Sequence, residues 1–254
     1  MRIEDRAGPD ATRELFQRTA EQWKVFGASE PYWSVLSAEK YKKKDINLES
    51  FYSTGAGDFE RLRKCFERCH CSISEIGSAL ELGCGVGRMT QFLSEAFKRV
   101  VAVDISQPHL ELARSRIRER GRTNVIFITL TGVEQARAFP TVDLFYSNIV
   151  LQHNPPPVIR EILEASLNAV APGGYAYFQL ITQVLDYDFD VSEYLAKPQR
   201  NPVPEMHALP QQAVFEILST RNFDVLEVRV DGAGDPANTI SNVFFARRRL
   251  NETS

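Results

Sequence analysis

The 254-residue chain carries 30 lysines and arginines against 33 aspartates and glutamates, a formal net charge of -3, and 43% of its residues are hydrophobic. This balance predicts a globular protein with a sizeable core and argues against a nucleic-acid partner, which favours a basic protein. No stretch reaches the roughly 20 apolar residues of a membrane span, and the first residues lack the apolar core of a signal peptide. We therefore expect a cytoplasmic protein without a membrane partner.

Residues 1–77 have a helical pattern, and we expect them to form an N-terminal helical cap. One amphipathic helix is predicted from about Thr12, and Glu30-Pro31-Tyr32-Trp33 is typical of a helix start with proline in its first turn. A second helix is predicted from about Asp58, after a loop at residues 47–57. The aromatic residues of this part either pack the cap onto the main domain or cover a ligand pocket. The second interpretation predicts as substrate-binding residues Tyr32, Trp33 and Tyr52.

The four cysteines stand at positions 65, 69, 71 and 84. Their spacing lacks the Cys-x2-Cys pair that is typical of zinc sites. Cys65 and Cys69 share one face of a predicted helix, which favours free thiols. We expect no metal site.

From residue 78 the pattern alternates strand and helix, which predicts a parallel sheet covered by helices on both faces. Strands are expected at residues 79–82, 100–103, 125–129, 142–147, 175–181, 223–230 and 239–247. Helices are expected at residues 86–97 and 107–120, after the prolines at 155–157, and after Leu209-Pro210. Residues 182–207 interrupt this rhythm. They are long for a connection, so we expect a lid over a substrate.

The stretch Glu81-Leu82-Gly83-Cys84-Gly85-Val86-Gly87 places three glycines directly after a predicted strand. Glycine reaches positive φ and lets a ligand approach the backbone, and we expect a helix from about Val86 to point its N–H groups into the loop. A phosphate-binding loop would need Lys and Ser or Thr after the last glycine, where Arg88-Met89 stands. A dinucleotide loop would need a small residue at position 88.

This stretch closely resembles the first motif of the class I S-adenosylmethionine-dependent methyltransferases. Val100-Val101-Ala102-Val103-Asp104 matches the family's second strand, which ends in an acid, and residues 139–148 and 167–174 resemble its fourth-strand motif and the turn before its fifth strand. The resemblance implies a Rossmann-like α/β fold with a seven-stranded sheet whose last strand is antiparallel. It places the methyltransferase domain at residues 78–254, after the cap.

The resemblance also assigns a site. Asp104 would bind the ribose hydroxyls, for which a carboxylate is a suitable double acceptor, and Ile105 would pack on the adenine. The implied cofactor is S-adenosylmethionine, with S-adenosylhomocysteine as product. The full set of implied cofactor-binding residues is Glu81, Gly83, Cys84, Gly85, Gly87, Arg88, Met89, Asp104, Ile105, Gly132, Val133, Ser147 and Asn148.

Methyl transfer needs a base only where the acceptor must lose a proton. His153, which follows the fourth strand, is the predicted catalytic or substrate-binding residue, and His207 is a further candidate for substrate binding. His109 is expected on the surface of a helix. The predicted reaction is methyl transfer to oxygen or nitrogen of a small-molecule acceptor. A cofactor-binding protein without catalysis and a nicotinamide-dependent oxidoreductase remain as alternatives.

Overall fold

The protein is described by a computed structural model that covers residues 2–42, 45–198, 204–233 and 237–250. Residues 199–203 of the predicted lid at 182–207 lie outside the described residues. In the described part of the chain no helix is both long enough and apolar enough to cross a membrane.

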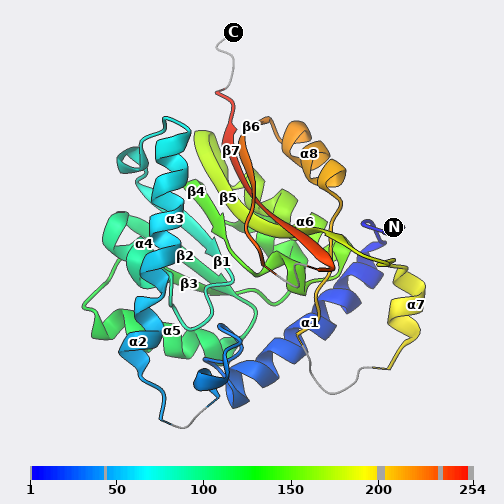
Figure 1. Ribbon diagram of the computed structural model, residues 1–254, viewed down its shortest axis with the longest axis horizontal. Coiled ribbons are helices and arrows are strands. Elements are labelled where there is room, and N and C mark those ends of the chain that lie inside the picture. Colours follow the sequence, from blue (N-terminus) through cyan, green and yellow to red (C-terminus); the bar gives the residue numbers. More distant parts are fainter. Residues whose placement is uncertain (1, 43–44, 199–203, 234–236, 251–254) are drawn as a thin grey trace. The chain divides into compact units, whose positions relative to one another are not determined.

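Seven strands form a mixed sheet with the order β3-β2-β1-β4-β5-β7-β6 (Figure 1). β7 runs antiparallel to β5 and to β6, whereas β2 pairs in parallel with β1 and β3, as β4 does with β5. This confirms the predicted sheet with its antiparallel last strand. The strands span Ser78–Leu82 (β1), Arg99–Asp104 (β2), Val125–Thr129 (β3), Val142–Ser147 (β4), Val170–Val184 (β5), Phe223–Val230 (β6) and Thr239–Arg248 (β7).

The helices follow the alternation that the sequence predicts from residue 78 onward, and three of them precede it. They span Pro9–Ser29 (α1), Leu48–Ser53 (α2), Gly55–Arg68 (α3), Thr90–Ala96 (α4), Gln107–Glu119 (α5), Pro156–Asn168 (α6), Val191–Ala196 (α7) and Gln211–Thr220 (α8).

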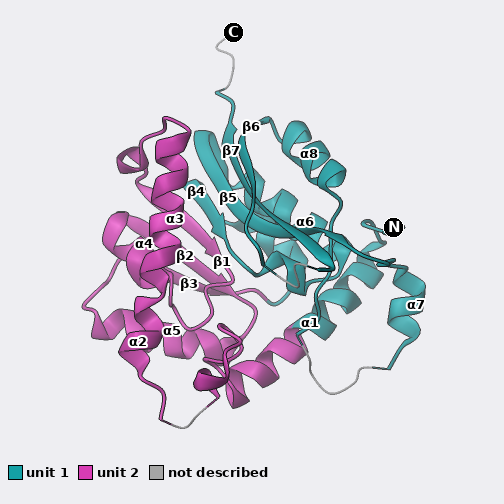
Figure 2. Cartoon of the chain, in the orientation of Figure 1, with its two compact units in different colours: residues 1–19, 131–254 teal, residues 20–130 magenta. Residues whose placement is uncertain are grey.

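The chain divides into two compact units, which Figure 2 colours separately. Unit 1 comprises residues 1–19 and 131–254, and unit 2 comprises residues 20–130. Most of the sequence before β1 therefore groups with β1, β2 and β3. The predicted cap of residues 1–77 and domain of residues 78–254 stay predictions.

Two predictions for the N-terminal part are wrong. Residues 31–35 form turns rather than the start of a helix. The predicted loop at 47–57 is helical instead, because α2 occupies most of it and α3 begins at Gly55. The side chain of Asn47 starts α2 by accepting a 2.9 Å hydrogen bond from the Ser50 N–H, which is the helix-capping role that asparagine commonly plays.

In unit 2 the middle of the three-stranded parallel segment is β2, whose residues 100–104 are all buried. A run of β-branched and small residues is typical of a strand covered on both faces. Cys84, Ala102 and Leu110 form one core cluster, which links the glycine loop, β2 and α5. The loop that follows β1 is thus held on the interior of the unit.

In unit 1 the sheet is held by aromatic side chains that face one another across neighbouring strands. Tyr146 stacks on Tyr177 with ring centroids 5.5 Å apart, and Tyr175 stacks on Phe245 at the same separation. Such cross-strand pairs stabilise a sheet beyond the burial of their area.

β5 begins earlier than predicted, at Val170. Its pairing with β4 jumps from Val170 to Tyr175 while β4 advances only from Val142 to Leu144, so the residues between form a bulge. Gly173 lies in this bulge at a φ of 84°. The two glycines predicted to turn the chain into a strand therefore lie inside the strand.

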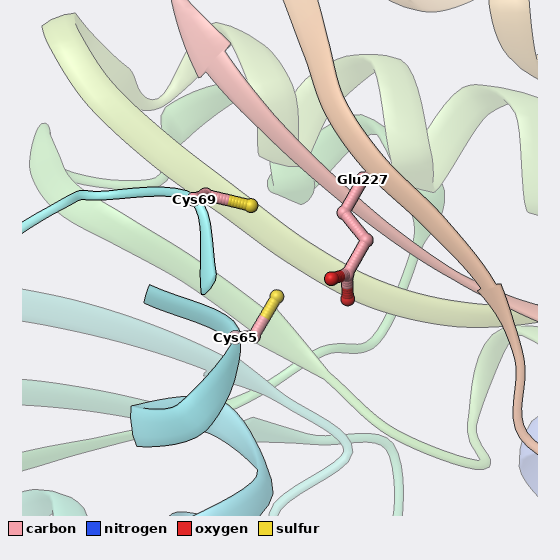
Figure 3. Close-up of side chains that lie close together, drawn as sticks. All are labelled: Cys65, Cys69 and Glu227. Carbon is pink, nitrogen blue, oxygen red and sulfur yellow. The ribbon is translucent and has the colours of Figure 1, made fainter. Parts of the chain in front are cut away.

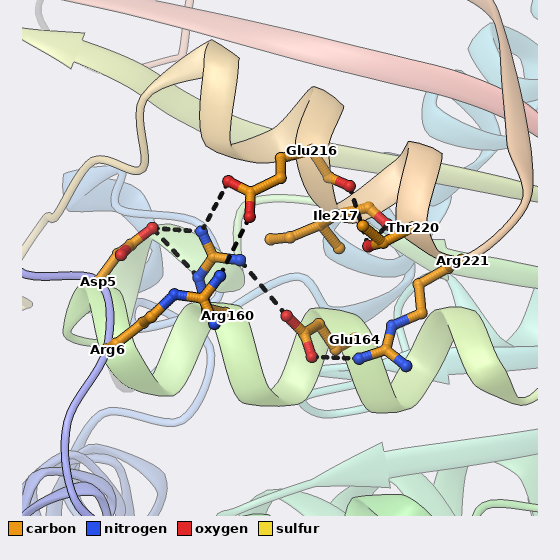
Figure 4. A network of polar contacts seen from close by, with 8 residues as sticks. All are labelled: Asp5, Arg6, Arg160, Glu164, Glu216, Ile217, Thr220 and Arg221. Atoms are coloured by element: carbon orange, nitrogen blue, oxygen red, sulfur yellow. Dashed lines mark hydrogen bonds and ion pairs between the residues drawn. The ribbon is translucent and has the colours of Figure 1, made fainter.

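The N-terminal residues of unit 1 are tied to α6 and α8 by a network of ion pairs (Figure 4). The side chain of Arg160 is 6% exposed and pairs with Asp5, with Glu164 at 3.4 Å and with Glu216 at 3.8 Å. Arg221 pairs with Glu164 as well. The Arg160 guanidinium therefore joins the N-terminal residues, α6 and α8, which are distant from one another in the sequence.

Candidate functional site

The glycine loop, residues 83–89, follows β1 and folds over the end of β2. The N–H groups of Gly83 and Cys84 both donate to the carbonyl of Val103, at 2.7 and 3.0 Å. Gly83, Gly85 and Gly87 adopt φ values of 73°, 53° and 86°, which lie in the left-handed region that side chains disfavour. The alternate glycines of the motif are therefore required by the path of the backbone.

The helix predicted from Val86 begins instead at Thr90, and residues 85–89 form turns. A right-handed helix cannot include Gly87 at positive φ. The expected row of helix N–H groups pointing into the loop is therefore wrong for this segment.

Asp104 is the residue that joins the loop to the end of β2. It is 8% exposed, and its two carboxylate oxygens accept hydrogen bonds of 2.8 Å from the N–H groups of Gly85 and Ser106. An ionised carboxylate has about four acceptor sites, so each oxygen retains capacity for a hydroxyl group. Asp104, the predicted ribose-binding residue, thus also links the glycine loop to the end of β2 through hydrogen bonds.

Glu81 lies at 2% exposure on β1 and accepts a 2.6 Å hydrogen bond from the Thr90 hydroxyl. Burial raises the pKa of its carboxyl to about 8, although the bond from Thr90 and the charge of Arg88 act against the rise. Burial also raises the pKa of the Cys84 thiol. Both groups are consequently uncharged at neutral pH in the protein alone.

Arg88 points away from the loop toward α3. Its guanidinium pairs with Asp58, a carboxylate on α3 that is only 5% exposed, and donates to the Thr54 hydroxyl at 3.3 Å. Met89 is buried at 4% exposure, and Ile105 is half-buried after β2. Arg88 therefore anchors the loop to the helical segment of unit 2.

The aromatic residues that precede α3 pack on the glycine loop. The Tyr52 hydroxyl donates to the Val86 carbonyl at 3.1 Å, and Tyr52 is 3% exposed. Tyr32 packs edge-to-face against Tyr52, with ring centroids 6.4 Å apart, and burial raises the pKa of both phenols. Trp33 is half-buried beneath the ammonium of Lys42. Of the three predicted substrate residues, Tyr52 supports the loop backbone.

Four predicted cofactor residues belong to unit 1. Gly132 precedes the 3-10 helix Val133–Ala138, and Val133, its first residue, is buried. Ser147 ends β4 and is fully buried, and Asn148 after it is half-buried. Their contact with a cofactor stays a prediction.

His153 and His207 meet through one residue that the sequence analysis did not single out, Glu205. His153 donates its Nδ1–H to the Glu205 carbonyl at 2.9 Å. His207 lies with Nε2 3.2 Å from the Glu205 carboxylate and with Nδ1 2.7 Å from the Tyr187 hydroxyl. Burial lowers the pKa of His153 to about 4, so its imidazole is neutral above that pH.

The described part of the predicted lid is anchored within unit 1. The Arg18 guanidinium donates to the carbonyls of Tyr194, Leu195 and Lys197, at 3.2, 2.6 and 3.0 Å. These carbonyls lie at the C-terminal end of α7, where the last carbonyls of a helix lack the usual donor four residues later. The function of residues 182–207 as a lid stays a prediction.

The expectation that His109 lies on the surface is wrong. It is 1% exposed on α5 and hydrogen-bonds Ser34 at 3.0 Å. The helical periodicity of α5 was a signal for its burial, because His109 falls on the same face as Ala113 and Arg116, which are also buried.

Cys65 is buried on α3, Cys69 is half-buried directly after the end of that helix, and neither forms a disulfide bond (Figure 3). Glu227, drawn with them, belongs to the other compact unit. A structural zinc site uses four ligands, and two thiols alone would provide half of that number.

Comparison with known proteins identifies the segment that contains the glycine loop and β2. Residues 79–174 match a family described as a methyltransferase domain. The ubiquinone biosynthesis O-methyltransferase of Vibrio cholerae is 29% identical over 105 residues, which are 41% of this chain and 42% of that protein. The chain thus aligns with less than half the length of this relative.

Two solved structures share the fold at low identity. The magnesium protoporphyrin IX methyltransferase of Synechocystis PCC 6803, with bound S-adenosylhomocysteine, is 13% identical with a TM-score of 0.61, over 91% of this chain and 99% of that one. The N-methyltransferase NodS of Bradyrhizobium japonicum WM9 is 15% identical with a TM-score of 0.58, over 91% and 98%. The strand order is that of the class I methyltransferase fold, and the segment that matches the methyltransferase-domain family contains the glycine loop and Asp104.

Proposed function

We propose that the protein transfers a methyl group from S-adenosylmethionine to oxygen or nitrogen of a small-molecule acceptor. The observation that carries this proposal is the geometry of Asp104, whose carboxylate ends β2 and fixes the loop N–H of Gly85 while keeping acceptor capacity on both oxygens. The family match over residues 79–174 supports it.

The residues present fit the donor chemically. A ribose offers two neighbouring hydroxyls to Asp104, and an amino-acid ammonium offers a cation to Glu81. Glu81 is a buried acid with a raised pKa, and a cation beside it would favour its ionised form. Half-buried Ile105, which follows Asp104, supplies an apolar surface for a base ring.

When bound, S-adenosylmethionine supplies an electrophilic methyl group. The chain's own contribution is to orient the reactants and to exclude water, since the displacement needs no universal catalytic residue. The positive φ values of Gly83, Gly85 and Gly87 set the path of the loop backbone, and Asp104 would fix the register of the nucleoside.

His153 has the chemistry of a base for an acceptor that must lose a proton. Because its Nδ1–H is donated to the Glu205 carbonyl, the lone pair of the neutral ring lies on Nε2. The low pKa keeps the ring neutral at physiological pH. The printed names of the relatives include an O-methyltransferase and an N-methyltransferase, which supports both acceptor atoms.

Calorimetry with S-adenosylhomocysteine tests donor binding. We expect micromolar affinity for the wild-type protein and a loss of about 100-fold in Asp104→Ala, because two hydroxyl bonds and the tie to Gly85 are removed together. Unchanged affinity in this variant would overturn the ribose assignment.

Radiolabelled methyl transfer to a panel of phenols, carboxylic acids and amines tests the reaction. Methylation of a panel member supports the enzyme, and His153→Gln then separates a base from a binding residue through kcat against KM. Donor binding without transfer to any panel member favours a non-catalytic binding protein, and tight binding of NAD without S-adenosylhomocysteine favours an oxidoreductase.

A further inference from the structure

Residues 31–36, a segment of turns between α1 and α2, cover the glycine loop within unit 2. A Cβ atom placed on Gly85 would lie 2.9 Å from Cγ2 of Val35. Val35 also packs against the cluster formed by Val86 and Tyr52. One side of the loop at Gly85 is thus walled by a segment that has no regular secondary structure of its own.

The same segment is fastened to α5 by a buried polar pair. Ser34 and His109 are 8% and 1% exposed, and Ser34 Oγ lies 3.0 Å from His109 Nε2. The Ser34 hydroxyl donates its proton to the Pro31 carbonyl at 3.1 Å. Ser34 must therefore accept from Nε2–H, which leaves the lone pair of His109 on Nδ1.

Nδ1 of His109 and Oγ of Ser106 are buried without hydrogen-bond partners. Both face Gly27 of α1, because a Cβ on Gly27 would lie 2.3 Å from the Ser106 oxygen and 3.2 Å from the His109 nitrogen. An extra proton on Nδ1 would therefore be buried in the space in front of Gly27 with no hydrogen bond formed to it. The arrangement accepts a neutral His109 in one tautomer.

We propose that Ser34 and His109 are positioning residues, which hold the 31–36 segment against Gly85 and so fix one wall of the donor site, and that this pair holds only while His109 is neutral. The proposal rests on the proposed function for its effect on donor binding. The pair is also close to Asp104 along α5, since Ser106, the N-cap residue of the helix that carries His109, donates its N–H to that carboxylate.

The direction of the pH effect follows from the surroundings of His109. Burial lowers its pKa below the ordinary value, and the charge of Asp104 on β2 opposes the shift only in part. The other groups that face it are uncharged, namely Ser34 and Pro31 of the segment, Trp23 of α1 and Ser106. When the segment is released, the His109 ring is exposed to water and binds a proton more readily. Acid below about pH 6.5 therefore favours release of the segment.

Tryptophan fluorescence reports on this segment without any ligand. The chain has only two tryptophans. Trp33 belongs to the 31–36 segment, and the Trp23 ring lies 6.4 Å from the His109 ring. We expect acid to shift the emission to longer wavelength and to increase acrylamide quenching between pH 7.5 and 5, while far-ultraviolet circular dichroism stays constant.

Three variants separate the pair from general folding. Ser34→Ala removes the acceptor and should give the acid-like emission already at pH 7.5. His109→Gln keeps an N–H donor near the Nε2 position but does not titrate, so it should retain the native emission at both pH values. His70→Asn, at an exposed histidine in the same unit, is the matched control and should behave as the wild type.

Donor affinity supplies the second readout. We expect Ser34→Ala to weaken S-adenosylhomocysteine binding about tenfold at pH 7.5, and we expect wild-type binding, but not that of His109→Gln, to weaken on acidification to pH 5.5. Native emission and affinity in Ser34→Ala, or an unaltered acid response in His109→Gln, would overturn the proposal. If wild-type protein bound no S-adenosylhomocysteine, the proposed function would fail, whereas the fluorescence arm would still decide the role of the pair.

Discussion

The Thr90 hydroxyl donates a 2.6 Å hydrogen bond to the Glu81 carboxyl at the buried start of the glycine loop. This bond favours the ionised acid, yet burial outweighs it and the pKa of Glu81 rises to about 8. The strand that leads into the loop therefore carries an acid that is mostly protonated at pH 7 and that can respond to an incoming charge.

We predict that binding of a cationic amino-acid ligand releases a proton from Glu81. The ligand ammonium lowers the pKa of the carboxyl, and protons leave because the free protein holds them at pH 7. Calorimetric titration of S-adenosylhomocysteine in phosphate and in Tris buffer should give enthalpies that differ by the buffers' ionisation heat. Glu81→Gln should remove the difference, and equal enthalpies in the wild type would contradict the prediction.

A second prediction concerns Gly85. Alanine at this position must adopt positive φ and must place its Cβ 2.9 Å from Val35. We expect Gly85→Ala to lower the free energy of unfolding by about 2 kcal/mol, measured by urea denaturation. In the double variant with Val35→Ala the steric part should be recovered and the φ strain retained. Full additivity of the two changes would show that the side chains do not meet.

A third prediction concerns the network of Figure 4. Arg160→Ala leaves Asp5 and Glu164 without their buried partner, and we expect a loss of about 2 kcal/mol in the free energy of unfolding. Arg6→Ala is the control, because its pair with Glu216 is exposed and should contribute less than about 0.5 kcal/mol. Similar losses in both variants would refute the special position of Arg160.

A fourth prediction is a loss of stability in acid that depends on His153. Its pKa is about 4 in the folded protein against an ordinary 6.5. Between these values the unfolded chain binds a proton that the folded one does not, so the free energy of unfolding falls as pH decreases from about 6.5 toward 4. Melting temperatures between pH 7.5 and 4.5 should fall less steeply for His153→Gln. A slope that the substitution leaves unchanged would assign the acid sensitivity to other groups.

Much of the sheet could be predicted because its strands carry strong local signals. The apolar run that ends in Asp104 and the segment Val142–Ser147 are strands at the expected positions. The start of α4 was misplaced because apolar periodicity does not reveal that Gly87 adopts positive φ. Local patterns report the identity of an element better than the residue where it begins.

Contacts between distant residues were beyond sequence reasoning. The glycine motif, the acid of β2 and His153 were found from their positions in the chain. Ser34 and Glu205 were missed, since a single serine or glutamate carries no signal until the fold brings a histidine to it. Arg88 was assigned to the cofactor from its place in the motif, whereas its guanidinium is paired with Asp58.

The position of β7 between β5 and β6 governs the order in which unit 1 can assemble. β6 is synthesised first, but its hydrogen-bonding partner is β7. Until residue 248 has left the ribosome, β5 keeps an open edge with the aromatic side chains of Tyr175 and Phe178 unstacked on that side. Unit 1 must therefore complete its sheet late and over long sequence separations, which is a slow kind of folding step. During synthesis the nascent chain therefore presents an unpaired strand edge. Such edges are prone to misassembly and are bound by chaperones.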